Sequence, residues 1–141
     1  MTEAFFLVSN NPLVAVTYPD LDLCLIEGFV LDTFLRTRDY IHCGHRLLTH
    51  PLSGSLKPGR IPCKTVFLTS EKPGLDLDSL RYIESSIEIY HKTAPRLPYS
   101  WPERLLADYA AVDLSHVEAA LESMLSLTGR RRHDRAGTGG S

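Results

Sequence analysis

The chain has 141 residues, 43% of them hydrophobic and 23% charged, with a formal net charge of -2 at pH 7. This composition is typical of one soluble globular domain that builds its core without disulfides or metals. The near-neutral charge gives no reason to expect a nucleic acid or an anionic membrane as partner. No basic signal region opens the chain and no apolar run approaches the ~18 residues of a membrane helix, so we expect a cytoplasmic protein.

Four short apolar segments predict β-strands. They cover residues 4–8, 21–26, 46–49 and 65–69. The first is continuously apolar, which indicates a strand covered on both faces, as in a parallel sheet between helices. Asn10 and Asn11 follow it, at the strand end where open α/β sheets usually bind ligands. An Asx turn leading into Pro12 explains the same asparagines without a ligand.

Apolar residues at helical spacing predict two longer helices. The first covers residues 29–43 and ends at Gly44, a residue suited to the left-handed position that follows a helix. The second begins after Asp76, which suits an N-cap. It carries an apolar stripe formed by Leu80, Ile83, Ile87 and Tyr90.

The C-terminal third contains two capping boxes. They are Ser100 with Glu103, and Ser115 with Glu118. They predict a short helix to about residue 107 and a last helix that ends at Gly129, with a fifth strand over residues 109–114 between them.

These elements predict an α/β fold: a single three-layer domain over residues 1–128, with a mostly parallel sheet of four or five strands flanked by helices. Residues 129–141 lack large apolar side chains, so we expect a disordered basic and glycine-rich tail. Its arginines suit an acidic partner or RNA, although a solvated chain end explains them more simply.

The loop within residues 44–58, GHRLLTHPLSGSLKP, is the best candidate for a binding site. Its hydroxyls, its lysine and the backbone N–H groups around Gly54 are donors that suit phosphate or carboxylate. We therefore hypothesise that it binds a small anionic ligand. The candidate ligand-binding residues are Asn10, Asn11, His45, Thr49, His50, Ser53, Gly54, Ser55 and Lys57.

Two other kinds of site use the same region. His42, Cys43, His45 and His50 are side chains that zinc favours, but their spacing differs from common zinc motifs and we predict neither a metal nor a cofactor. His50 as a general base, with Ser53 or Ser55 as nucleophile, gives an enzymatic alternative. No acidic partner for His50 follows from the sequence, so we favour binding over catalysis.

The same loop resembles one protein family. The likeness rests on THPLSGS at residues 49–55, on Asn10-Asn11-Pro12, on Glu27-Gly28, and on Arg38-Asp39-Tyr40-Ile41-His42. Over about residues 5–125 the chain resembles the GrdX family, whose members are encoded beside the glycine, sarcosine and betaine reductases of amino-acid-fermenting bacteria. The resemblance implies an accessory or ligand-binding protein of that metabolism. An enzyme acting on a small carboxylate or phosphate, and a structural partner of reductase subunits, are the alternatives.

Overall fold

The structure is a computed structural model that describes residues 4–96 and 99–137, with side chains to Met124. A three-stranded sheet lies at its centre, formed by β1 (Phe5–Ser9), β2 (Leu23–Leu25) and β3 (Thr65–Thr69) in the order β2-β1-β3. β1 is parallel to β2, with Leu7 opposite Leu23, and antiparallel to β3, with Leu7 opposite Phe67. The sheet is therefore mixed, and the mostly parallel sheet of four or five strands that we predicted is wrong.

The segment before the candidate loop explains part of this difference. Leu48 N–H donates to Phe67 O at 2.9 Å and Thr69 N–H donates to Arg46 O at 2.9 Å, yet only an isolated bridge, Leu47 to Leu68, results. A loop rather than a crossover helix joins this segment to β3, so the two run antiparallel. An apolar run marks a buried strand but carries no information on its direction.

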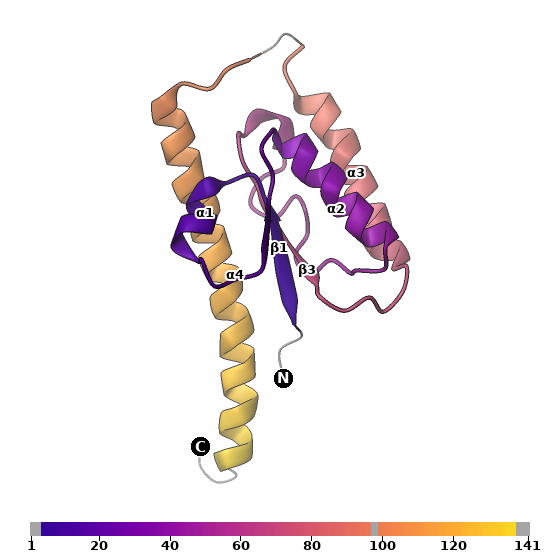
Figure 1. Ribbon diagram of the computed structural model, residues 1–141, viewed down its shortest axis with the longest axis vertical. Helices are drawn as coiled ribbons and strands as arrows, with labels where there is room; N and C mark the ends of the chain where they lie inside the picture. The colour runs from indigo at the N-terminus through magenta and orange to yellow at the C-terminus, as the bar shows by residue number, and fades with distance from the viewer. Residues whose placement is uncertain (1–3, 97–98, 138–141) are drawn as a thin grey trace.

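Helices cover both faces of the sheet (Figure 1). α2 (Val30–His42) and α3 (Leu77–Thr93) lie on one side, and α1 (Pro12–Thr17) and α4 (Glu103–Gly137) lie on the other. Alternate residues of β1 enter the two cores, because Val8 packs with α2 and α3 while Leu7 packs with Val14 and Val117. The fold is α/β, with a smaller sheet than expected.

α2 and α3 lie close to their predicted positions. Gly44 follows α2 with a φ of 109°, in the left-handed region, and Asp76 caps α3 by accepting a hydrogen bond from Ser79 N–H at 2.9 Å. The sequence pattern does not predict α1, since six residues are too few to show a helical period. This helix begins at Pro12, and Asn11 Oδ1 caps it by accepting from Leu13 N–H at 3.1 Å.

α4 replaces three predicted elements. The short helix, the strand over residues 109–114 and the last helix form one helix, and the predicted fifth strand is wrong. Ser115 does not start a new helix, because its hydroxyl donates to Val112 O at 2.7 Å within the turn. The helix also continues past Gly129. The division of the chain into a domain over residues 1–128 and a tail over residues 129–141 stays a prediction.

The candidate loop leads into a short 3₁₀ turn, η1 (Pro58–Arg60), that lies against the end of α3. Gly59 N–H donates to Thr93 Oγ1 at 2.8 Å, and Arg60 Nε–H donates to Thr93 O at 2.7 Å. These contacts hold residues 58–60 against the end of α3, and α2 also contacts this turn. No helix in the described part of the chain is long and apolar enough to cross a membrane.

Candidate functional site

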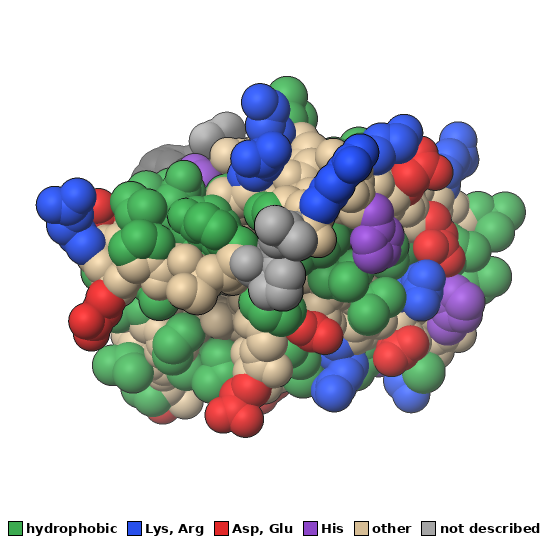
Figure 2. All heavy atoms as spheres, turned by 90° about the horizontal axis from the view of Figure 1, so that it is seen from above, with side chains coloured by type: hydrophobic (Ala, Val, Ile, Leu, Met, Phe, Trp, Pro, Cys, Tyr) green, Lys and Arg blue, Asp and Glu red, His purple; other side chains and the backbone are tan. Residues whose placement is uncertain are grey.

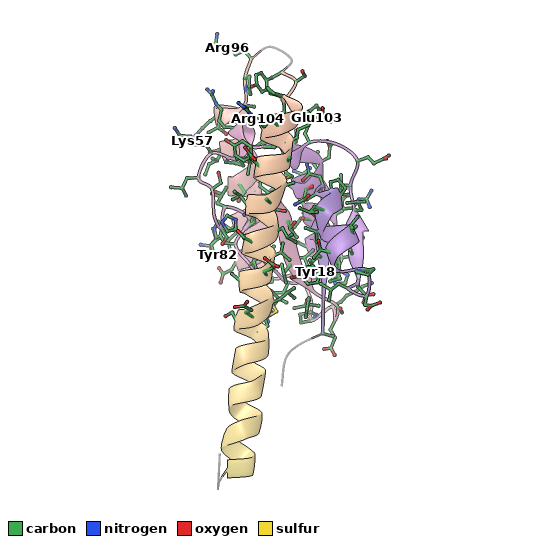
Figure 3. The ribbon with its side chains drawn as sticks, turned by 90° about the vertical axis from the view of Figure 1, so that its left-hand side faces the viewer. Tyr18, Lys57, Tyr82, Arg96, Glu103 and Arg104 are labelled. Atoms are coloured by element: carbon green, nitrogen blue, oxygen red, sulfur yellow. The ribbon has the colours of Figure 1, made fainter. Side chains whose placement is uncertain are left out.

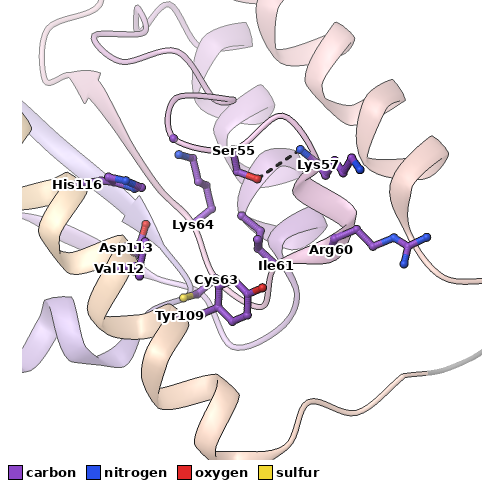
Figure 4. Close-up of a pocket in the computed structure, with 11 residues that line it drawn as sticks. Ser55, Lys57, Arg60, Ile61, Cys63, Lys64, Tyr109, Val112, Asp113 and His116 are labelled. Atoms are coloured by element: carbon purple, nitrogen blue, oxygen red, sulfur yellow. Dashed lines mark hydrogen bonds between the residues drawn. The ribbon is translucent and has the colours of Figure 1, made fainter.

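A cavity of about 310 Å³ lies between residues 54–64 and the first half of α4 (Figure 4). Eleven residues line it: Gly54, Ser55, Lys57, Arg60, Ile61, Cys63, Lys64, Tyr109, Val112, Asp113 and His116. The α4 members are spaced at i, i+3, i+4 and i+7, so they share one helical face. One wall is therefore a helix, and the other is formed by residues 54–64, from the end of the candidate loop to the residue before β3.

Asp113 anchors the helical wall. Its side chain is only 5% exposed, and Oδ2 accepts hydrogen bonds from Asn11 Nδ2–H at 3.0 Å and from Thr65 Oγ1–H at 2.7 Å. Thr65 donates its only hydroxyl proton there, so Ser9 Oγ–H must donate across the 2.7 Å contact to Thr65 Oγ1. Asn11 N–H in turn donates to Ser9 Oγ at 3.0 Å. This chain of donors joins α4 to the ends of β1 and β3.

Lys64 supplies a buried amine to the cavity. The residue is 5% exposed, its backbone N–H donates to Asn10 Oδ1 at 2.8 Å, and Nζ donates to the carbonyl oxygen of Ser53. Burial lowers the pKa of Lys64, and the neighbouring Asp113 carboxylate opposes that shift by favouring the charged form. An ammonium group has three donor hydrogens, so Nζ has capacity beyond its bond to Ser53.

The reactivity of the Cys63 thiol, which lies next to Lys64, tests whether this wall of the cavity is buried. Burial, reinforced by the Asp113 carboxylate, raises the pKa of Cys63 to about 12, whereas Cys43 is exposed. Because the thiolate is the nucleophile, Cys63 stays protonated and unreactive at pH 8. We expect iodoacetamide at pH 8 to label Cys43 of the folded protein at least tenfold faster than Cys63, as measured by mass spectrometry of peptides. Equal rates would contradict the buried position of Cys63.

The candidate asparagines lie behind the cavity and do not line it. Asn10 Nδ2–H donates to Gly28 O at 3.0 Å and to Pro62 O at 2.8 Å, while Oδ1 accepts from Lys64 N–H. Asn11 Nδ2–H also donates to Ala110 O at 3.0 Å. Both amides are fully engaged by protein groups, so they position the loop and α4.

Two candidate histidines lie away from the cavity. His45 is buried, its Nδ1 lies 2.7 Å from Thr69 O, and its ring packs edge-on against Phe6 and Tyr40. His50 Nδ1 accepts from Leu52 N–H at 3.0 Å, and its ring lies 5.0 Å from that of Tyr82. Nδ1 of His50 is therefore engaged by the backbone, and among the described residues no hydrogen bond joins the His50 ring to Ser53 or Ser55.

The other candidate residues surround the cavity or a smaller hollow beside it. Gly54, Ser55 and Lys57 line the cavity itself. Thr49 and Ser53 line the neighbouring hollow of about 40 Å³, which shares three lining residues with the cavity: Lys64, Asp113 and His116. The structure therefore brings five of the nine candidates together.

Sequence reasoning missed the helical wall. The sequence pattern places Tyr109 and Asp113 in a strand and His116 at the start of a helix, yet their spacing in one continuous helix puts them on one face. Lys64 directly precedes a buried strand, and that position was the available signal for a buried amine. Among residues whose side chains the structure describes, no three His, Cys, Asp or Glu side chains are grouped as metal ligands.

Comparison with known protein families gives a match over most of the chain. Residues 6–122 match the family model described as GrdX-like protein. The chain belongs to the GrdX-like protein family. No curated protein and no solved structure matches it. The family match includes both walls of the cavity, from the candidate loop to His116 of α4.

Proposed function

We propose that this GrdX-like protein binds a small anion, a carboxylate or a phosphate, in the cavity between residues 54–64 and α4, as an accessory protein of glycine-reductase-type metabolism. The observation that carries the proposal is the buried Lys64 amine at the cavity wall. An ammonium group removed from water is costly unless charge and hydrogen bonds compensate it. An anion in the cavity supplies both.

The charges of the lining favour an anion over a cation. Lys57, Arg60 and Lys64 are basic, and Asp113 is the one acidic residue among the described residues of the lining. The Asp113 carboxylate already accepts two hydrogen bonds. Figure 4 shows the side chains of Arg60 and Lys57 both extending away from α4, with Arg60 Nε–H held by Thr93 O, so Lys64 is the cation that lies between the loop and the helical wall, and Lys57 adds its charge from the outer side of the cavity. Ser55 and His116 add donors from the two walls.

The metabolic setting is supported by the family match, because the GrdX resemblance implies proteins encoded beside glycine, sarcosine and betaine reductases. A binding role has more support than the two alternatives. The enzymatic alternative has less support, because His50 Nδ1 accepts from Leu52 N–H and, among the described residues, no hydrogen bond joins the His50 ring to a loop serine. A structural partner of reductase subunits does not require a buried amine in a cavity.

A thermal-shift screen tests the proposal. Acetate, glycine, phosphate, acetyl phosphate and nucleotides are added at millimolar concentration, each at matched ionic strength. At 100 times its Kd, a ligand that binds only the folded state adds about 2.7 kcal/mol to the free energy of unfolding. We expect at least one anion to raise the Tm by several degrees.

Two variants assign that shift to the cavity. Lys64→Met removes the buried ammonium, and Lys57→Met removes an exposed one whose loss leaves the core intact. We expect Lys64→Met to abolish the anion-dependent shift and Lys57→Met to reduce it at least threefold. Lys92→Met, on the exposed face of α3 beside Glu88, is the matched control. An undiminished shift in both cavity variants would exclude this site.

A further inference from the structure

A second hollow, of about 150 Å³, lies at the end of the molecule where the chain passes from α3 to α4. Four of its eight described lining residues are aromatic: Phe29, Tyr90, Tyr99 and Trp101. They come from the N-cap of α2, from α3 and from the segment before α4. Among the described residues, Ile61 is the one lining residue that this hollow shares with the cavity between residues 54–64 and α4.

Two of these aromatic side chains face water to an unusual degree. Phe29 is 62% exposed and Tyr99 is 50% exposed, and Figure 2 shows hydrophobic side chains at this end of the molecule interspersed with Lys and Arg side chains. Burial of the aromatic surface in the protein core therefore does not account for the cluster. A group of aromatic rings that is open to solvent around a hollow requires another explanation.

The rings of Tyr99 and Trp101 are adjacent and nearly perpendicular. Tyr99 and Trp101 have centroids 5.0 Å apart and an interplanar angle of 88°. Tyr109 of α4 contacts Trp101 with centroids 5.5 Å apart and an angle of 70°, so the helix fixes the orientation of the indole. Perpendicular aromatic walls around a small space are the arrangement that holds a methylated cation through the negative faces of the rings.

Charges of both signs lie near the hollow (Figure 3), and the negative ones are a carboxylate and a helix C-terminus. The Asp32 carboxylate accepts a hydrogen bond from Phe29 N–H at 2.7 Å, and after burial it is the second cause that raises the pKa of Tyr90. Ala94 and Pro95 follow the C-terminus of α3, which is the negative end of the helix dipole. Three bases also lie at this end of the molecule: Arg60, whose Nε–H is held by Thr93 O at 2.7 Å, and Arg96 and Arg104, on either side of the linker to α4 (Figure 3).

We propose that this aromatic hollow, formed by Phe29, Tyr90, Tyr99 and Trp101, binds a methylated ammonium group. A quaternary ammonium group spreads its charge over apolar methyl groups, so it loses little hydration when it enters an aromatic site, and it gains the attraction of the ring faces. A primary ammonium loses more hydration and is disfavoured. The site is separate from the anion cavity, and its test does not depend on anion binding.

Choline and its uncharged isostere 3,3-dimethylbutan-1-ol separate the attraction of the charge from simple apolar contact. Trp101 is the only tryptophan of the chain, so intrinsic fluorescence reports on one wall of the hollow directly. At constant chloride concentration we expect choline to produce a saturable change in Trp101 emission, with at least tenfold weaker binding of the neutral alcohol. Equal affinities, or no saturable change with choline, would overturn the proposal.

A pair of tyrosine variants places the effect in the hollow. Tyr99→Leu removes one exposed wall and keeps the fluorophore, and it is expected to weaken choline binding at least fivefold. Tyr82→Leu is the matched control, because Tyr82 is also a half-exposed tyrosine, with 45% of its surface exposed. Figure 3 shows that Tyr82 lies far from the linker between α3 and α4, whose two ends are marked by Arg96 and Glu103. Circular dichroism checks that both variants are folded. Unchanged choline affinity in folded Tyr99→Leu would contradict the assignment.

Discussion

Asp113→Ala is expected to lower the free energy of unfolding by about 3 kcal/mol, a large fraction of the total for a domain of this size. The buried Asn11 amide and Thr65 hydroxyl would lose their common acceptor, Asp113 Oδ2. The buried Lys64 amine would at the same time lose the neighbouring charge that favours its protonated form. Urea unfolding at pH 7, followed by circular dichroism, measures the change.

Asp108→Ala is the matched control, because Asp108 is an exposed carboxylate on the same helix. Both variants replace aspartate by alanine in the same helix, so they gain the same helix propensity. We expect the free energy of unfolding of Asp108→Ala to lie within about 0.5 kcal/mol of that of the wild type. If Asp113→Ala lowered the free energy of unfolding by less than about 1 kcal/mol, the hydrogen bonds that join Asp113 to the ends of β1 and β3 would contribute little to holding α4 on the sheet.

Gly59→Ala is expected to destabilise the protein by about 2 kcal/mol and to displace the turn that leads into the cavity. A Cβ at Gly59 would lie 2.3 Å from Ala94 N and 2.6 Å from Tyr90 O, both backbone atoms at the end of α3. Backbone cannot rotate away as a side chain can, so either η1 must leave α3 or the last turn of α3 must open. The change is measured by urea unfolding.

Gly74→Ala separates this steric effect from the general cost of replacing glycine. Gly74 has a φ of 123°, and a Cβ there would have no atom beyond the adjacent residues within 4 Å. Its substitution therefore costs backbone strain alone, on the order of 1 kcal/mol. We also expect amide NMR shifts of residues 57–61 to change in Gly59→Ala and not in Gly74→Ala. A smaller effect at Gly59 than at Gly74 would contradict the close contact between η1 and α3.

Local signals in the sequence predicted α2, α3 and the approximate positions of the three strands, but not the size of the sheet or the direction of its strands. Gly44 and Asp76 marked helix ends through their own backbone and capping chemistry, and the structure has them in those roles. Strand direction and helix continuity depend on contacts far along the chain. Residues 109–114 have an apolar pattern that suits a strand, and packing against α1 and the sheet makes them helical instead.

The candidate site was predictable only on its loop side. Ser53, Gly54, Ser55 and Lys57 stood out because a polar, proline-rich loop is poor at building a core, and they lie around the cavity or the hollow beside it. Lys64, Asp113 and His116 come from segments with ordinary sequences, and only the fold brings them to the loop. The asparagines stood out for their position after β1, but their amides are occupied by Gly28, Pro62 and Ala110.

NMR titration of the ¹⁵N-labelled protein with the anion that gives the largest thermal shift is the most direct test of the central claim. The account predicts saturable amide shifts that are concentrated in residues 53–64 and 109–116, together with a shift of the Lys64 side-chain signal. Saturable shifts that cluster elsewhere, or shifts that are unchanged in Lys64→Met, would contradict anion binding between the loop and α4.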